Sequence, residues 1–388
     1  LSAERASLLF MVVILFLVAV WGLSIAIRWA LKHLNFFFRT SLHSFWYAAC
    51  SNSQLSRWFI AITPVHEKEY HPTAGLVLLF FCSFFTIIFL SFLVIQNTWV
   101  QSINVPVNLF LQSIRSPTFD SFFVFIGLII HPLSLGILTL SISIYFIYQK
   151  DWRTLCFWLS LILSSIVIVS FMAWVVKIPS IDSNHALTLK PAYYPDIYLT
   201  LATSLLGFLI FYISARYRTV LTLGIRIFFV IVLFLAGISI LYLGDNWLTS
   251  VITAYFTGLW VCLGHWIWFR RVGQQQRKSH IPIVFSCLML VIGTIISYVI
   301  YFELNIIAHQ PVFKQYVLTE KIWWSQNSPI LPLYTKNRIG QRKGLFNFQY
   351  IGSLEALKKD LAFSGWKIYD DSFLSSLLMR TGAKKAHT

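Results

Sequence analysis

The sequence predicts an all-α polytopic membrane protein with a small extramembrane α+β domain at its C-terminus. Of its 388 residues, 57% are hydrophobic and only 11% are charged, whereas soluble domains carry about 25% charged residues. Several apolar runs reach the roughly 20 residues that a helix needs to cross a bilayer core of ~30 Å. These runs do not alternate apolar and polar residues, as the strands of a membrane β-barrel would.

Eight apolar runs are predicted to span the membrane as helices. They are Leu8–Ile27, Gly75–Ile95, Phe122–Tyr148, Leu155–Val176, Ile197–Ser214, Leu221–Leu243, Trp247–Phe269 and Ile283–Phe302. The first is too long for a signal-peptide core and has no small-residue cleavage site behind it. The third contains His131-Pro132, and because proline interrupts helical hydrogen bonding we expect a short re-entrant piece followed by a helix.

Basic residues are concentrated in alternate loops, which predicts the orientation of the chain. Arginines and lysines follow the first, third, fifth and seventh predicted spans. Loops of this kind face the cytoplasm. The remaining loops and everything after Phe302 are then on the other side, which is the periplasm if the membrane is a bacterial inner membrane. The same pattern accounts for the net charge of +16, and no base-stacking motif or zinc-finger spacing indicates a nucleic-acid partner.

These patterns divide the chain into three parts. Residues 1–74 form an N-terminal transmembrane helix and a cytoplasmic connector, residues 75–303 form a membrane bundle, and residues 304–388 form the extramembrane domain. Val105–Ile114 has apolar residues at helical spacing and is expected to lie on the outer face as a short amphipathic helix. Within the C-terminal part, SLEALKKDLAFSGW predicts a helix with Ser353 as its N-cap and Gly365 at its end.

One stretch at the outer face carries a resemblance to a known family. GISILYLGDNWLTSVITAYFTG resembles the third signature of the type 2 phosphatidic-acid phosphatase superfamily, S-R-x5-H-x3-D, through Ser239, Tyr242, Leu243, Gly244 and Trp247. The resemblance extends to VNLFLQSIRSPTFDSFFVFIGLIIHP and to WVVKIPS, and covers roughly residues 75–270. It implies that superfamily's helical bundle, with a site at the outer face.

The resemblance also shows which catalytic groups are replaced here. In the family a histidine of the third signature attacks phosphorus and an aspartate orients it. In this sequence Asn246 stands at the nucleophile position and Ser250 at the position of the orienting acid. The arginine of that signature, which holds a phosphate oxygen, is replaced by Ile240.

The other two signatures are altered in the same way. The second signature aligns with PDIY, so that Asp196 replaces a serine and Tyr198 replaces the histidine that acts as general acid. The arginine-proline pair of the first signature falls on Asn184 and His185. Loss of general acid catalysis alone costs about 10²–10⁴ in rate, and the nucleophile has gone as well. The family's reaction is therefore not expected, and no residue is predicted to be catalytic.

The polar residues that remain at the outer mouth are candidates for binding a lipid headgroup. Lys177 and Ser239 are retained from the family signatures, and Asp245 lies beside the nucleophile position. We expect Asp196, Tyr198, Asp245 and Asn246, together with Asp182 and His185, to converge there. They would form either a rebuilt site for a cation or a zwitterionic headgroup, or a set of solvated residues at helix ends. No metal site and no cofactor are predicted, since no His-x3-His or carboxylate cluster is present.

A second resemblance concerns the C-terminal part. LPLYTKNRIGQRKGLFNFQYIGSLEALKKDLAFSGW is similar to an LssY-type C-terminal domain, through Asn347, Gln349, Tyr350, Gly352, Gly365 and Trp366. This tail often follows a DedA-type lipid transporter domain and a phosphatase-like bundle. The chain begins with Leu1 and not with methionine, which fits an upstream region of that kind.

Three functional hypotheses follow. The leading one is a catalytically inactive scaffold or lipid-binding subunit of the bacterial envelope. Its ligands would be polyprenyl phosphates or phospholipids, and its protein partners would bind residues 304–388. The second is an active phosphatase for undecaprenyl pyrophosphate or phosphatidic acid that uses His185 with Asp182 or Asp196. The third is a part of a DedA-type lipid transporter.

Overall fold

The computed structural model describes most of the bundle and parts of the C-terminal region. The described residues are 71–96, 98–178, 193–216, 220–271, 281–310, 333–337, 339–345 and 352–366, with single residues at 14, 18, 22, 25, 54, 57, 319 and 321. Within them, seven helices are long and apolar enough to cross a membrane. The chain is therefore a multi-pass membrane protein, and seven of the eight predicted spans are confirmed. The first, Leu8–Ile27, lies outside the described residues except at four single positions.

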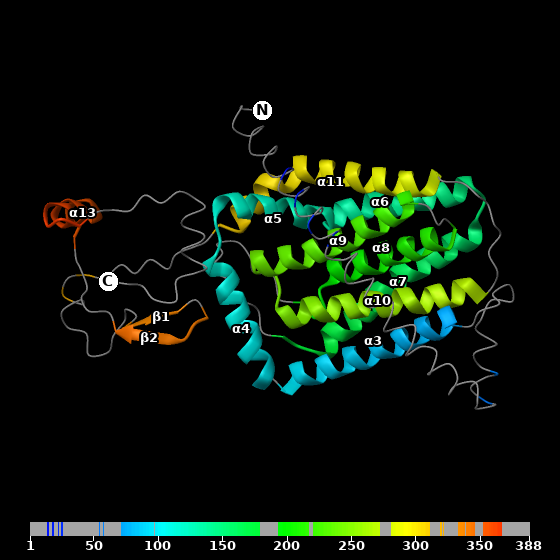
Figure 1. Ribbon diagram of the computed structural model, residues 1–388, viewed down its shortest axis with the longest axis horizontal. Coiled ribbons are helices and arrows are strands. Elements are labelled where there is room, and N and C mark those ends of the chain that lie inside the picture. The colour runs from blue at the N-terminus through cyan, green and yellow to red at the C-terminus, as the bar shows by residue number, and fades with distance from the viewer. Residues whose placement is uncertain are drawn as a thin grey trace.

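The described helices form a bundle whose long axes run side by side (Figure 1). In chain order they are α3 His71–Gln96, α4 Thr98–Ser113, α5 Pro117–Ile129, α6 Pro132–Tyr148, α7 Trp152–Val175, α8 Ile197–Arg216, α9 Val220–Leu243, α10 Leu248–Arg271 and α11 Ile281–Ala308. Helix α10 packs extensively against α3 and α8, and α11 packs against α5 and α6. Helix α4 lies across one end of the bundle (Figure 1).

The core of the bundle consists of aromatic and aliphatic side chains. Trp158 and Phe208 are fully buried, and Trp266 stacks on Phe269. Close helix contact is possible at Gly258, where an added Cβ would lie 2.7 Å from the Thr200 carbonyl oxygen. Small residues that let helix backbones approach are typical of membrane bundles.

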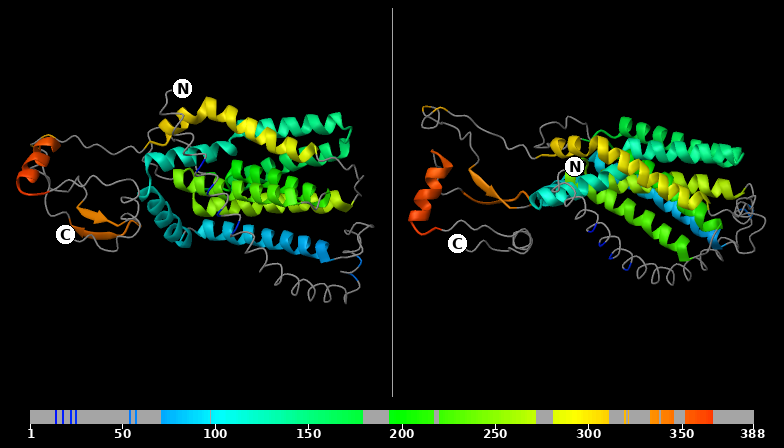
Figure 2. Two further views of the ribbon diagram at one scale, coloured as in Figure 1. Left: turned by 45° about the horizontal axis from the view of Figure 1, so that its top comes forward. Right: turned by 90° about the horizontal axis from the view of Figure 1, so that it is seen from above.

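The third predicted span is broken but does not turn back. Helix α5 ends at Ile129 and α6 begins at Pro132, with His131 as its N-cap. The two pieces lie end to end in the ribbon views (Figures 1 and 2), and α11 packs along both. The expectation of a re-entrant piece is therefore wrong. Proline occupies the first position of a new helix, where its missing N–H costs no hydrogen bond.

Two predicted boundaries differ from the structure. The surface helix begins at Thr98 and not at Val105. Pro106 lies inside this helix and does not interrupt it. Helix α11 continues to Ala308, so its last turn lies beyond the predicted start of the extramembrane domain at residue 304. That last turn carries Asn305, whose side chain lines a cavity in the bundle.

The described part of the C-terminal region contains a hairpin and a helix. Strands β1 Tyr334–Lys336 and β2 Arg342–Leu345 pair in antiparallel register. Helix α13 Leu354–Phe363 has Ser353 as its N-cap, whose hydroxyl accepts from the Ala356 N–H at 3.1 Å, as predicted. The hairpin turn lies beside α4 (Figures 1 and 2).

That turn depends on one glycine. Gly340 has φ +84°, a left-handed conformation that glycine adopts without steric cost. A Cβ at this position would also lie 2.5 Å from Leu109 Cδ1 on α4. The turn is therefore seated against the surface helix at a point where no side chain fits.

Candidate functional site: a polar cavity at the α4 end of the bundle

A cavity of about 180 Å³ lies where several helix ends meet. Its lining comes from the C-terminal ends of α5, α9 and α11 and from the N-terminal ends of α6 and α8. Six of the sequence-predicted positions line it: Asp196, Tyr198, Ser239, Ile240, Asp245 and Asn246. The expected convergence is thus observed for Asp196, Tyr198, Asp245 and Asn246, which come from two segments about 50 residues apart.

Asn246, which the resemblance aligns with a nucleophile, makes hydrogen bonds through both its side-chain nitrogen and its side-chain oxygen. Its side-chain nitrogen donates to the Tyr193 carbonyl oxygen at 3.1 Å and to Asp196 Oδ2 at 3.0 Å. Its side-chain oxygen accepts from the Trp247 N–H at 3.1 Å. The residue is 3% exposed. Asn246 therefore ties the α9–α10 turn to the segment that precedes α8.

Ser250 supports the same connection. Its hydroxyl donates to the Tyr193 carbonyl oxygen at 2.6 Å, so that this carbonyl accepts from both Ser250 and Asn246. The neighbouring Tyr194 hydroxyl is hydrogen-bonded to Ser91 and to Thr253 at 3.2 and 2.9 Å. Ser250 thus helps to hold the backbone at Tyr193 in place.

Asp196 is the N-cap of α8 and a buried wall of the cavity. Its Oδ1 accepts from the Leu199 N–H at 2.9 Å, a usual capping arrangement. Burial raises the pKa of the Asp196 carboxyl, while the hydrogen bonds from the Leu199 N–H and from Asn246 offset part of that rise. The negative charge of nearby Asp245 raises it further.

Asp245 forms an ion pair with His309, which follows α11. His309 Nε2 lies 2.9 Å from Asp245 Oδ1, and His309 Nδ1 lies 2.7 Å from the Asn305 carbonyl oxygen. Both partners are acceptors, so both ring nitrogens must carry hydrogen, and we assign the ring as imidazolium on that basis. Burial lowers the pKa of His309, but its contacts with Asp245 and the Asn305 carbonyl outweigh burial and raise it overall.

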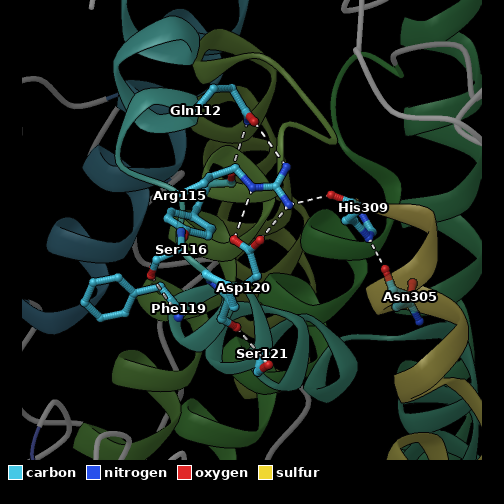
Figure 3. A network of polar contacts seen from close by, with 10 residues as sticks. Gln112, Arg115, Ser116, Phe119, Asp120, Ser121, Asn305 and His309 are labelled. Atoms are coloured by element: carbon cyan, nitrogen blue, oxygen red, sulfur yellow. Dashed lines mark hydrogen bonds and ion pairs between the residues drawn. The ribbon is translucent and has the colours of Figure 1, made fainter. Parts of the chain in front are cut away.

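Arg115 joins this ion pair to the surface helix (Figure 3). Its guanidinium binds both oxygens of Asp120 at 3.1 Å each and also donates to the His309 carbonyl oxygen and to Gln112 Oε1. Gln112 in turn donates to the Tyr242 carbonyl oxygen at 3.1 Å. The Arg115 side chain is only 7% exposed. The network therefore fixes the ends of α4, α5, α9 and α11 relative to one another.

Two further polar groups of the lining are also engaged. His131 Nδ1 accepts from the Leu133 N–H at 3.3 Å, and its ring stacks on Tyr301 with centroids 4.4 Å apart. The Ser239 hydroxyl donates to the Phe123 carbonyl oxygen at 2.6 Å. His131 is thus a hydrogen-bonded residue of the bundle, and Ser239 links α9 to α5.

The remaining predicted positions do not contribute to the lining, or cannot be placed. Lys177 is exposed just beyond the end of α7 and is not part of the cavity wall. Ser250 lies behind Tyr193, away from the cavity. Asn184, His185 and Asp182 lie outside the described residues.

Sequence reasoning missed His309, Asn305 and Arg115. His309 and Asn305 were assigned to the extramembrane domain, because the apolar run appeared to end at Phe302. Arg115 and Asp120 belong to the segment RSPTFD, where an arginine five residues before an acid was a signal for a local ion pair. The pairing of His309 with Asp245 spans 64 positions and has no local signature.

The described residues contain no group of three or more histidine, cysteine or acidic side chains placed to hold a metal ion. Comparison of the chain with family models, with curated proteins and with solved structures gives no match. The properties of the cavity must therefore be argued from its own chemistry.

The His309–Asp245 pair predicts a pH-dependent stability. Because the pKa of His309 is raised in the folded protein, the pair stabilises fully below the unfolded value of about 6.5. This stabilisation is lost as pH rises through the folded value. The charged groups around His309 are Asp245, Arg115 and, through Arg115, Asp120.

The melting temperature of the detergent-purified protein is therefore expected to fall as pH is raised above about 6.5, and this fall should be reduced in His309→Gln. His265→Gln is the matched control, because His265 bonds within its own helix to the Val261 carbonyl. Equal pH profiles for the wild type and His309→Gln would contradict the assignment.

Proposed function

We propose that this protein is a non-catalytic lipid-binding protein of the bacterial inner membrane, built on a bundle like that of the type 2 lipid phosphatases. The cavity at the α4 end would hold the lipid headgroup. Residues 304–388 would face the periplasm and bind envelope partners. The observation that supports the proposal best is the state of Asn246, which is locked in a structural role where the resemblance implies a nucleophile.

Asn246, Ser239 and Ser250 do not form an activated nucleophile. A hydroxyl attacks phosphorus only when a base can take its proton. The hydroxyls of Ser239 and Ser250 both donate to backbone carbonyl oxygens. The side-chain nitrogen of Asn246 donates to two acceptors, and an amide nitrogen is a poor nucleophile in any case. None of the three meets the chemical requirement.

The two histidines of the lining are no better placed to attack. An imidazole needs an unprotonated ring nitrogen directed at phosphorus. His309 faces acceptors at both nitrogens. His131 uses Nδ1 as an acceptor, so its hydrogen is on Nε2 in the neutral ring. Neither histidine therefore presents a nucleophilic nitrogen to the cavity.

The cavity is also a poor site for a phosphate dianion. No lysine or arginine of the described chain lines it, whereas Asp196 and Asp245 do. Carboxylates close to a phosphate repel it, more strongly in a partly buried site than in water. The apolar part of the cavity lining, which comes from α5 and α9, suits the glycerol and upper acyl region of a lipid. Binding without turnover is the function that this combination supports.

The first experiment is a phosphate-release assay on the detergent-purified full-length protein. With undecaprenyl pyrophosphate and with phosphatidic acid as substrates, we expect no release above the protein-free rate. Release that disappears in His185→Ala would overturn the proposal in favour of an active phosphatase.

The second experiment is mass spectrometry of the lipids that copurify with the protein. We expect a bound lipid that is lost in Ile197→Trp, which fills the cavity from the start of α8. Leu163→Trp is the control, because Leu163 lies 65% exposed on α7, outside the cavity. Absence of any bound lipid from the wild type, or equal retention by both variants, would contradict a headgroup site at this cavity.

A further inference from the structure

Resting on the proposed function, we propose that the lipid carries an ammonium group, as an aminoethyl phosphodiester headgroup does, and that this ammonium is bound between Asp245 and Asn305. The charge of this ligand group is opposite to that of the phosphate dianion that the resemblance implies. It rests on two side chains with oxygen acceptors, Asp245 and Asn305, that line the same cavity.

Asp245 supplies the first acceptor. Its side chain is 35% exposed, whereas its partner His309 is 8% exposed, so the carboxylate is the accessible member of the pair. A carboxylate offers about four lone-pair sites, and the bond with His309 uses one of them on Oδ1. Asp245 can therefore accept from an ammonium without giving up His309.

Asn305 supplies a second acceptor. Its side-chain nitrogen donates to the Tyr301 carbonyl oxygen at 2.9 Å, and this bond fixes the orientation of the amide. Within the described chain no donor reaches its side-chain oxygen, and Asn305 lines the cavity. An oxygen held in this way is suited to a ligand that brings N–H groups.

The surroundings favour a cation at this end of the cavity. Helices α9 and α11 both end here, at Leu243 and Ala308, and the C-terminal end of a helix carries a partial negative charge. The charges of Asp245 and His309 offset each other, and the carboxylate is the more exposed of the two groups. Tyr193 and Tyr198 also line the cavity.

The remainder of a zwitterionic headgroup has a place as well. The N-terminal ends of α6 and α8 border the cavity at Pro132 and Ile197, and the positive ends of helix dipoles favour a phosphodiester anion. A volume of about 180 Å³ admits several water molecules, since about 10–15 Å³ of such space is enough for one. A small headgroup fits this space, and an oligosaccharide headgroup does not.

The test compares short-chain lipids by native mass spectrometry of the full chain in detergent. The probes are dioctanoyl phosphatidylethanolamine, phosphatidylglycerol and phosphatidic acid, with glycerophosphoethanolamine as the soluble headgroup alone. We expect phosphatidylethanolamine to bind at least about tenfold more tightly than phosphatidylglycerol. The soluble headgroup should bind more weakly than the lipid, since it lacks the acyl contacts.

Two variants locate the site. Asn305→Leu removes the second acceptor without changing charge, and Asp245→Asn removes the charge. Each is expected to weaken phosphatidylethanolamine binding by about tenfold, the effect of one charge-assisted hydrogen bond, and to leave phosphatidylglycerol binding unchanged. Glu303→Gln is the control, because this exposed acid lies on α11 outside the cavity lining. Melting temperatures of all variants check that they fold.

The outcomes separate the inference from the proposed function. Equal or tighter binding of phosphatidylglycerol or phosphatidic acid would overturn the inference and leave lipid binding intact. Phosphatidylethanolamine binding that survives both Asp245→Asn and Asn305→Leu would overturn it too. Tighter binding of the soluble headgroup than of the lipid would show that the ligand is not a lipid. A wild-type protein that binds none of the probes would count against the proposed function itself.

Discussion

Arg115→Met is expected to lower the free energy of unfolding by about 3–5 kcal/mol, the usual cost of removing one partner from a buried ion pair. Arg115 is 7% exposed and holds both oxygens of Asp120. Its loss leaves Asp120 without its bidentate partner and the His309 carbonyl without this donor. An SDS-unfolding titration in mixed micelles measures the change, and intrinsic tryptophan fluorescence reports it.

The control and the double variant test the reason for this loss. Lys343→Met removes a cation from the exposed strand β2 and should change stability by less than about 0.5 kcal/mol. Arg115→Met combined with Asp120→Leu should recover part of the loss, because no uncompensated carboxylate remains. If the double variant is as unstable as the sum of the two single variants, the ion pair is not what stabilises this end of the bundle.

Asn246→Ala is expected to cost about 2–3 kcal/mol, because it leaves the buried Asp196 carboxylate without its side-chain donor. The bonds to the Tyr193 carbonyl and from the Trp247 N–H are lost as well. If Asn246 were a solvated turn residue, the same change would be nearly neutral. The thermal unfolding midpoint in detergent, read with the SDS titration, distinguishes these cases.

Ser250→Ala is the matched control for this prediction. It removes one bond to the Tyr193 carbonyl, which still accepts from Asn246, so we expect a loss of about 1 kcal/mol. Asp196→Asn introduced into Asn246→Ala should recover stability, since a neutral amide is cheaper to bury than a carboxylate. Failure of that rescue would mean that Asp196 is not the group affected by loss of Asn246.

The sequence was sufficient to predict the membrane bundle, because hydropathy alone marks apolar runs of spanning length. Seven spans follow that pattern in the described chain. Two errors in the bundle arose at prolines. His131-Pro132 was expected to divide the third span into a short re-entrant piece and a following helix, but Pro132 begins a helix that continues the path of α5. The surface helix was expected over Val105–Ile114, but it begins at Thr98, and Pro106 lies within it.

The site was predictable only in part, for a physical reason. Asp196 and Asn246 could be brought together through the resemblance, which supplies a long-range alignment. The pairing of His309 with Asp245 could not be predicted, because the two residues are distant in sequence. In addition, the end of α11 is polar enough to resemble a segment outside the membrane. Hydropathy detects where a helix leaves the apolar core of the bilayer, not where its hydrogen bonding stops.

The seating of the Gly340 turn against Leu109 has a mechanical consequence. Helix α4 makes that contact near its C-terminal end and carries Gln112 one turn further on. Arg115 donates to Gln112 and to the carbonyl of His309. A force applied to the hairpin by a bound protein would thus be transmitted through α4 and Arg115 to His309, which lines the cavity. Binding of a partner to the hairpin would then change the affinity of the cavity for its ligand.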